Sequence, residues 1–264
     1  MSGVDARTKI EVDAVSKEYR TRGGDPILAM SDTSLTVGSG EFICVVGPSG
    51  CGKSTLLQII LGLTSASSGE VRVGGTRVDG PRRDVGVVFQ QALLLPWLTV
   101  LGNVMLPVTV QRRRKSDFLD RAQHLLDMVG LSGFEDRYPS ELSGGMQQRV
   151  AIARALIHQP AYLLLDEPFG ALDALTRETM NVELQRIWME TGATVLLITH
   201  SIPEAVFLAD RVAVMSPRPG MIVDMIDVPF SRSRDLELLT DPGFATLTKQ
   251  IRSHFTPNAS RGID

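Results

Sequence analysis

The sequence predicts an α/β fold with a mixed sheet, an antiparallel β subdomain and an inserted helical subdomain. Apolar and polar residues alternate near the N-terminus, as at residues 10–13, which indicates half-buried antiparallel strands. Continuous apolar runs, such as residues 162–165 and 194–199, indicate buried parallel strands. Between these two regions, residues 100–158 carry apolar side chains at helical spacing. A helical lobe inserted into an α/β body accounts for all three patterns.

Composition and charge place the chain among ordinary globular proteins. Its 264 residues suit one large domain or two closely packed lobes, and the net charge of -3 argues against bulk affinity for nucleic acid. No run approaches the roughly 18 apolar residues of a membrane span, and the first residues lack the apolar segment of a signal peptide. Cys44 and Cys51 are expected to be reduced thiols in the cytosol. A role at a membrane would therefore need membrane spans on another chain.

The first hundred residues are expected to form strands around one helix. Glycine-rich turns and the change of periodicity from two to 3.6 separate these elements. The expected elements are a strand at 10–13, a turn at 23–26, a strand around Leu35 and Val37, a short buried strand at 41–46, a helix from Thr55, a hairpin at 71–78 and a fully buried parallel strand at 85–89.

The helical lobe and the second half of the body follow. One helix is expected between Ser116 as its N-cap and Gly130 as its stop, and a second from about Met146 to His158. We expect residues 1–225 to form the main domain and residues 226–264 a short, helical C-terminal tail. The remaining expected elements are strands at 162–165, 194–199 and 212–215 and helices at 176–190 and 205–208.

A glycine-rich segment between the expected 41–46 strand and its helix matches the pattern G-x-x-x-x-G-K-[ST]. Strand, glycine loop and helix together predict a phosphate cradle, because backbone N–H groups and the helix dipole both favour an anion. The lysine should reach the β- and γ-phosphates and the serine should bind Mg²⁺; a glycine-rich turn that binds nothing is the alternative. The expected phosphate-binding residues are Gly47, Pro48, Ser49, Gly50, Cys51, Gly52, Lys53, Ser54 and Thr55.

Polar residues stand at the ends of three expected strands. Asp166 and Glu167 follow a buried strand, where Asp166 is expected to bind Mg²⁺ with Ser54 and Glu167 to activate a water molecule. His200 ends another strand and is expected to contact the γ-phosphate, and Gln90 ends the 85–89 strand at the same edge. The alternatives are a pair of solvated acids and a structural histidine.

The segment Leu-Ser-Gly-Gly-Met-Gln-Gln-Arg at 142–149 opens the second helix of the lobe. Exposed N–H groups at such a helix start form an anion site, although Ser143 could simply cap the helix while Gly144 and Gly145 shape a turn. This segment resembles the signature of the ATPase subunits of ABC transporters. The phosphate loop, Gln90, the Leu-Leu-Leu-Asp-Glu-Pro strand, the 171–173 segment and His200 occur in that family's order, so the resemblance covers roughly residues 8–225.

The resemblance implies an ATPase with ATP and Mg²⁺ as ligands, in which two copies of the chain sandwich two nucleotides head to tail. Ser143, Gly144 and Gly145 would then bind the γ-phosphate held by the partner's phosphate loop. The resemblance also implies that Asp173 belongs to the nucleotide site, that Gln90 contacts the metal and takes part in catalysis, and that Tyr19 stacks against adenine. An ordinary tyrosine at a strand end is the alternative for Tyr19.

Further segments are similar to the nitrate, sulfonate and taurine importers of bacteria, notably residues 94–100, 168–177 and 215–220. That similarity implies two membrane-spanning permease subunits, a solute-binding protein, and a place on the cytoplasmic face of the inner membrane. In this family the loop after Gln90, which here carries Trp97, borders the groove that receives a permease helix. A soluble ABC ATPase of DNA repair or translation is the alternative, but it would usually carry coiled coils, zinc-binding cysteines or two cassettes.

One basic cluster, residues 112–115, stands apart from these motifs. The sequence Arg-Arg-Arg-Lys most simply forms a solvated face or flanks a helix. Contact with anionic lipid or with nucleic acid is the alternative, which the negative net charge of the chain opposes.

Overall fold

The computed structural model describes residues 9–20, 24–170 and 172–256. The expected turn at 23–26 therefore begins outside the described residues. The strands are β1 (Ile10–Tyr19), β2 (Ile27–Val37), β3 (Phe42–Val46), β4 (Ser68–Val73), β5 (Thr76–Arg77), β6 (Val85–Val88), β7 (Tyr162–Asp166), β8 (Thr194–Thr199), β9 (Arg211–Met215) and β10 (Ile222–Asp227). The helices are α1 (Lys53–Ile60), α2 (Val100–Val104), α3 (Leu106–Val110), α4 (Leu119–Met128), α5 (Gly144–Leu156), α6 (Ala174–Thr191), α7 (Ile202–Leu208) and α8 (Pro242–Ser253), with 3-10 turns at Lys115–Phe118, Pro139–Glu141 and Leu236–Thr240.

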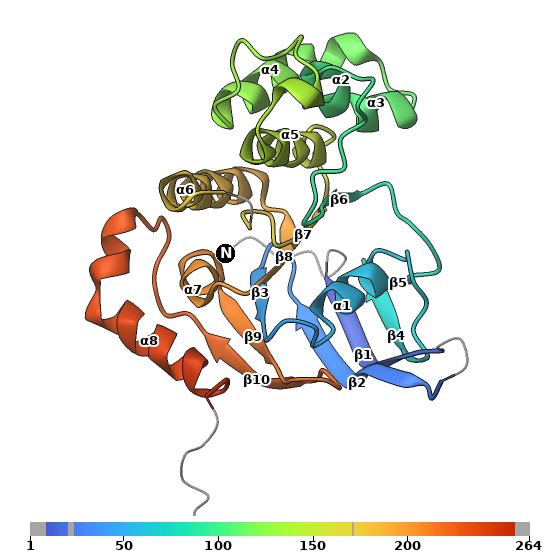
Figure 1. The fold of residues 1–264 in the computed structure, drawn as a ribbon, viewed down its shortest axis with the longest axis vertical. Coiled ribbons are helices and arrows are strands. Elements are labelled where there is room, and N and C mark those ends of the chain that lie inside the picture. The colour runs from blue at the N-terminus through green and yellow to red at the C-terminus, as the bar shows by residue number, and fades with distance from the viewer. Residues whose placement is uncertain (1–8, 21–23, 171, 257–264) are drawn as a thin grey trace, which may run out of the picture.

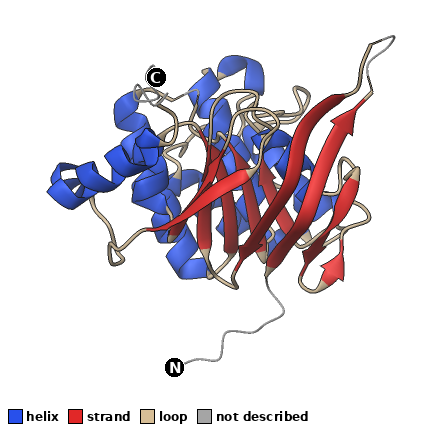
Figure 2. Ribbon diagram, turned by 90° about the horizontal axis from the view of Figure 1, so that it is seen from below, coloured by secondary structure: helices blue, strands red, loops and turns tan. Residues whose placement is uncertain are grey.

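The strands form two sheets. A six-stranded sheet has the order β10-β9-β3-β8-β7-β6 and is parallel except for β10, which pairs antiparallel with β9. A four-stranded antiparallel sheet has the order β2-β1-β4-β5. The two sheets lie beside each other, as the view from below shows (Figure 2). The predicted mixed sheet and antiparallel subdomain are both present.

The central sheet buries both faces because its side chains alternate along each strand. In β3, Phe42 and Cys44 pack with the helices α5 to α8, whereas Ile43 and Val45 pack with α1 and the antiparallel sheet. Helix α1 is thus enclosed between the two sheets, and Leu56 and Leu57 are fully buried there. This burial fixes the start of α1 and so the loop before it.

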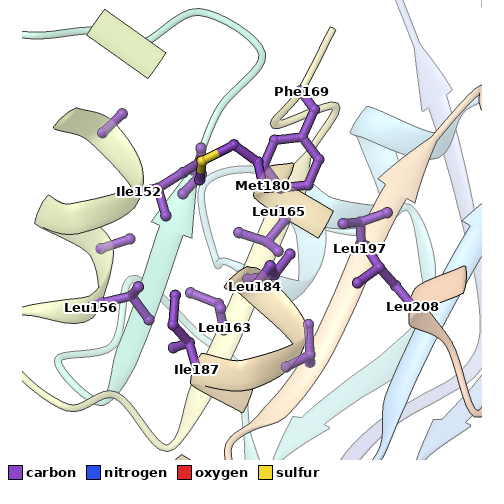
Figure 3. Packing of buried hydrophobic residues seen from close by; sticks show 14 of the residues in the cluster. Ile152, Leu156, Leu163, Leu165, Phe169, Met180, Leu184, Ile187, Leu197 and Leu208 are labelled. Carbon is purple, nitrogen blue, oxygen red and sulfur yellow. The ribbon is translucent and has the colours of Figure 1, made fainter. Parts of the chain in front are cut away.

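Helices α2 to α5 form a lobe above the sheets (Figure 1). Helix α5 joins this lobe to the body, because the apolar side chains of α5 pack against β7 and α6 (Figure 3). The side chains that meet there are Ile152, Leu156, Leu163, Leu165, Met180, Leu184 and Ile187. The inserted helical lobe expected at residues 100–158 is therefore in contact with the sheet that carries the site.

Two expectations for local structure are wrong. Ser116 does not cap the first long helix, because a 3-10 turn precedes α4 and the Ser116 hydroxyl bonds to Asp117. The strand β6 is parallel but not fully buried: it forms one edge of the central sheet, and Val85 and Val87 remain partly exposed. An apolar run alone does not distinguish an edge strand from a central strand.

The C-terminal residues contribute to the same core. Strand β10 crosses residue 225, the expected end of the main domain, and Phe244, Leu247 and Ile251 of α8 are buried against the helical side of the central sheet. Arg234 is buried and donates hydrogen bonds to the carbonyl oxygens of Val206, Phe207 and Ala209, at 3.1, 2.9 and 2.8 Å. The arginine thereby caps the C-terminal end of α7.

The basic cluster at residues 112–115 lies at the start of the 3-10 turn before α4, and its four side chains are exposed. The Arg113 guanidinium lies 4.4 Å from the centre of the Phe118 ring, so this side chain covers an aromatic residue. Across the described part of the chain, no helix has both the length and the apolar character needed to cross a membrane.

Candidate functional site

The loop between β3 and α1, residues 47–52, curls around the N-terminus of the helix. Gly50 and Gly52 have φ values of 74° and 110°, which strain any residue with a side chain. A Cβ atom on Gly52 would also lie 3.0 Å from the carbonyl oxygen of Ala29. The first N–H groups of a helix have no intrahelical partner, so the loop and the start of α1 present donors to an anion.

Lys53 places a positive charge inside this loop. Its side chain is only 6% exposed, and Nζ donates hydrogen bonds to the carbonyl oxygens of Gly47 at 2.8 Å and Pro48 at 3.0 Å. Burial of an ammonium group is unfavourable unless the group is well bonded. The loop thus holds the cation where an anion bound to the backbone N–H groups would meet it.

Ser54 and Asp166 lie together beside the loop. Strands β3 and β7 flank β8 and run parallel to it, so their C-terminal ends meet at one edge of the sheet. The Ser54 hydroxyl donates a hydrogen bond of 3.2 Å to Asp166 Oδ1. Burial raises the pKa of Asp166, and the bond from Ser54 partly opposes that rise. A hydroxyl and a buried carboxylate are the oxygen ligands that Mg²⁺ prefers.

Glu167 is held by two neighbours from other strands. Its Oε2 accepts a hydrogen bond from Gln90 Nε2 at 3.1 Å and lies 3.2 Å from His200 Nδ1. Its backbone has a left-handed φ of 46°, and its N–H donates to the carbonyl oxygen of Ile198 at 2.8 Å. The three side chains named from the sequence at the ends of β6, β7 and β8 therefore form one cluster.

A pocket of about 670 Å³ connects the loop to this cluster. Its polar end is formed by the phosphate loop, the start of α1 and the Gln90–Glu167–His200 cluster. Tyr19, which is 38% exposed, lines the pocket beyond the loop, and Lys17 Nζ lies 5.1 Å from the centre of its ring. The predicted residues that line the pocket are Tyr19, Ser49, Gly50, Gly52, Lys53, Ser54, Thr55, Gln90, Glu167 and His200.

Sequence reasoning missed three residues in the pocket wall. Ile27 and Ala29 come from β2, and Arg218 comes from the turn between β9 and β10. A topological signal exists for Arg218: β9 pairs in parallel with β3, so the turn after β9 reaches the sheet edge where the phosphate loop begins. No sequence pattern marks the two β2 residues.

The signature segment lies apart from this pocket. Ser143 caps α5 by accepting a hydrogen bond from the N–H of Met146 at 3.3 Å, and neither it nor Gly144 or Gly145 belongs to the described pocket wall. Asp173 likewise caps α6, accepting from the N–H of Thr176 at 3.0 Å, and Ala171 before it lies outside the described residues. These segments contribute nothing to the nucleotide-sized pocket of their own chain.

The chain resembles curated proteins over most of its length. Residues 30–170 match the family described as ABC transporter. The chain is 46% identical to the taurine import ATP-binding protein of Roseobacter denitrificans over 85% of this chain and 84% of that protein. It is 48% identical to the bicarbonate transport ATP-binding protein of a Synechocystis species (90% and 86% covered) and 46% identical to the nitrate import ATP-binding protein of Synechococcus elongatus (90% and 88%).

Solved structures give the same assignment. A dimeric bacterial ABC transporter cassette superposes with a TM-score of 0.77 and 36% identity, covering 84% of this chain and 100% of that cassette. The same cassette in a post-hydrolysis state, bound to ADP and phosphate, gives a TM-score of 0.76 at 35% identity over 84% and 100%. The chain therefore belongs to the ABC transporter family as one of its ATPases.

Proposed function

We propose that this chain is the ATP-hydrolysing subunit of a bacterial ABC importer that takes up a small anion or organic solute, such as nitrate, a sulfonate or taurine. The observation that carries the proposal is the Glu167 carboxylate, held by Gln90 and His200 in the pocket that begins at the phosphate loop. The taurine, bicarbonate and nitrate relatives support the solute class. Each of these relatives is named for transport, and none for DNA repair or translation.

The chemistry assigned to the site is hydrolysis of the γ-phosphate of ATP. Lys53 and the loop N–H groups bind the phosphates, and Glu167 accepts a proton from the attacking water. His200 and Gln90 orient the carboxylate of Glu167 toward that water. Ser54 and Asp166, with Gln90, would hold Mg²⁺, which neutralises phosphate charge when bound.

A homodimer would complete the site. The signature residues Ser143, Gly144 and Gly145 and the nearby Asp173 are absent from the pocket wall of their own chain, as expected if they serve the nucleotide of a second copy. The dimeric state of the related cassette supports this arrangement. ATP would then act as the contact between two chains, and hydrolysis would release them.

Two permease subunits would convert this cycle into transport at the cytoplasmic face of the inner membrane, with a solute-binding protein on the far side. An apolar groove of about 440 Å³ between β6 and the helical lobe supports the permease contact; Phe89, Leu93 and Val110 line it. Trp97 does not belong to the described groove wall, but it lies on the connecting loop and is 70% exposed. A tryptophan left in water on a folded loop favours a partner surface.

The test begins with ATP hydrolysis by the purified chain. Glu167→Gln should still bind Mg-ATP and form a stable dimer, while phosphate release falls by at least about a hundredfold. Lys53→Ala should lose both binding and hydrolysis. Affinity purification of the chain from membranes should then recover two permease subunits, identified by mass spectrometry. A Glu167→Gln variant that hydrolyses ATP at the wild-type rate would exclude Glu167 as the base.

A further inference from the structure

The turn between β9 and β10, residues 216–220, forms one side of the ATP pocket. Arg218 at the centre of this turn is exposed and lines the pocket together with Tyr19, Ile27 and Ala29. These four residues come from three separate segments and lie outside the phosphate loop. Within the part of the chain that the structure describes, the Arg218 guanidinium forms neither a hydrogen bond nor an ion pair. The cation thus faces the pocket with its donors free.

The turn is fastened to the strand that forms the neighbouring wall. Gly220 N donates to the carbonyl oxygen of Ala29 at 3.1 Å, and Gly220 O accepts from Ser31 N at 2.9 Å and Thr33 Oγ1 at 3.3 Å. The Ser216 hydroxyl accepts from the N–H of Met221 at 3.1 Å and closes the turn. Arg218 therefore projects from a short segment whose two ends are both hydrogen-bonded.

The same turn also touches the phosphate loop. A Cβ atom on Gly220 would lie 1.8 Å from the carbonyl oxygen of Cys51, so only glycine allows this approach of the two backbones. The side chain of Met215, which precedes the turn, also approaches Gly47 and Gly52 of the loop. The position of Arg218 relative to the phosphate loop is consequently set by direct backbone packing.

We propose that Arg218 binds the nucleoside part of ATP, whereas Lys53 contacts the phosphates. This inference rests on the proposed function, because it concerns the same nucleotide. The part of the pocket wall that β1 and β2 contribute consists of Tyr19, Ile27 and Ala29, which suits a base better than a phosphate group. A guanidinium can stack on a flat base and donate hydrogen bonds to its ring nitrogens or to ribose hydroxyls. Residues 216–220 thereby complete the base pocket that Tyr19 begins.

Equilibrium binding of ATP and of inorganic tripolyphosphate, measured by calorimetry at constant ionic strength, tests the proposal. Arg218→Ala should weaken ATP binding by roughly 3- to 30-fold, the range of a cation–aromatic contact. Its affinity for tripolyphosphate, which has no nucleoside, should stay within about twofold of the wild-type value. The ATP affinity of Arg218→Lys should fall between those of the wild type and Arg218→Ala, because an ammonium group keeps the charge but lacks the flat donor face of the guanidinium.

Arg252→Ala, which removes an exposed arginine from the last turn of α8, is the matched control and should leave both affinities unchanged. Thermal melting of each variant checks the fold. Unaltered ATP binding by Arg218→Ala, or an equal loss of tripolyphosphate binding, overturns the assignment of Arg218 to the nucleoside. A wild-type chain that binds no ATP would overturn the proposed function as well, so the two failures are distinguishable.

Discussion

The imidazole of His200 lies against the carboxylate of Glu167, with 3.2 Å between Nδ1 and Oε2. The side chain of His200 is 61% exposed, whereas that of Glu167 is 19% exposed, and both line the pocket. His200→Ala should lower the rate of phosphate release by about 10² to 10⁴-fold while ATP affinity changes little. Steady-state kinetics and equilibrium binding measure the two effects separately.

His254 offers the control for this variant, because it also lies 3.1 Å from a carboxylate, Asp224, at a distance from the pocket. His254→Ala should hydrolyse ATP as the wild type does. If His200→Ala retained wild-type turnover, His200 would be a structural neighbour of Glu167 and nothing more.

A substitution at Gly144 tests whether the signature segment of one chain contacts the nucleotide bound by a second chain. It is the first residue of α5, and a Cβ atom there would meet no other atom within 4 Å. An aspartate at a helix start is compatible with the helix dipole, so Gly144→Asp should fold and bind ATP. Its carboxylate would repel the γ-phosphate held by a second chain. Light scattering with Mg-ATP, in chains that also carry Glu167→Gln, should show a monomer.

Mixed dimers extend this test. A Gly144→Asp chain paired with a Lys53→Ala chain retains one site with an intact phosphate loop and an intact signature segment. The mixture should therefore recover ATPase activity that neither variant shows alone, and Gly144→Ala should dimerise normally. ATP-dependent dimers formed by Gly144→Asp at wild-type affinity would exclude the head-to-tail sandwich.

Trp97 is predicted to bind the permease rather than the core of its own chain. With 70% of its surface exposed, Trp97→Ala should shift the melting temperature of the isolated chain by no more than about 2 °C. Its ATPase rate should also be unchanged. Copurification with the permease, or coupled transport in vesicles, should decrease. A fall of many degrees in the melting temperature would instead identify Trp97 as a packing residue.

Substitution of Asn103, unlike that of Trp97, should lower the stability of the isolated chain. It is fully buried; its amide accepts from Leu95 N at 2.8 Å and donates to the carbonyl oxygens of Leu95, Leu98 and Thr99 at 3.0 to 3.1 Å. Asn103→Ala removes all four of these bonds, including the one that Leu95 N donates, and should destabilise the chain by roughly 2 to 4 kcal/mol in urea unfolding. A loss below about 0.5 kcal/mol would show that the loop keeps its shape without the amide.

We expect the buried Glu204 side chain to make the free energy of unfolding depend on pH. Burial raises its pKa from 4.5 to about 7, and the bond to Thr199 and the charges of Arg177 and His200 oppose that rise. The native chain therefore keeps a proton that the unfolded chain releases, so stability falls as pH rises from about 4.5 to about 7, by on the order of 3 kcal/mol in total. Glu204→Gln should remove this fall.

Urea unfolding at about pH 5 and about pH 8 measures the effect, with the exposed Glu237→Gln as control. The wild type should lose stability relative to Glu204→Gln at the higher pH, whereas Glu237→Gln should follow the wild type. Parallel curves for the wild type and Glu204→Gln would show that Glu204 does not titrate in this range.

Much of the site could be predicted from the sequence because its residues stand at strand ends. A buried run such as 163–165 ends where the sheet ends, so Asp166 and Glu167 had to lie at the same edge as the phosphate loop. The same logic placed His200 and Gln90. The order of strands was the missing information: without it, β6 could not be recognised as an edge strand, and Arg218 could not be placed beside Cys51.

Local signals failed where tertiary contacts decide the outcome. Ser116 has the chemistry of a helix cap, but the chain begins α4 with a 3-10 turn that buries Phe118, and burial of that ring outweighs one cap hydrogen bond. Strand β10 has one buried residue, Ile226, and no strong apolar pattern, so its pairing with β9 defines it. Burial in the core decides the first feature, and strand pairing decides the second.

The bonds from Arg234 to the end of α7 have a consequence for how the chain can be engineered. Helix α7 begins two residues after His200, and its far end is tied through Arg234 to the segment that continues into α8. A chain cut before residue 234 would leave three carbonyl groups of this helix without their donor. A module fused after α8 would therefore be connected, through Arg234 and α7, to the segment that begins at His200.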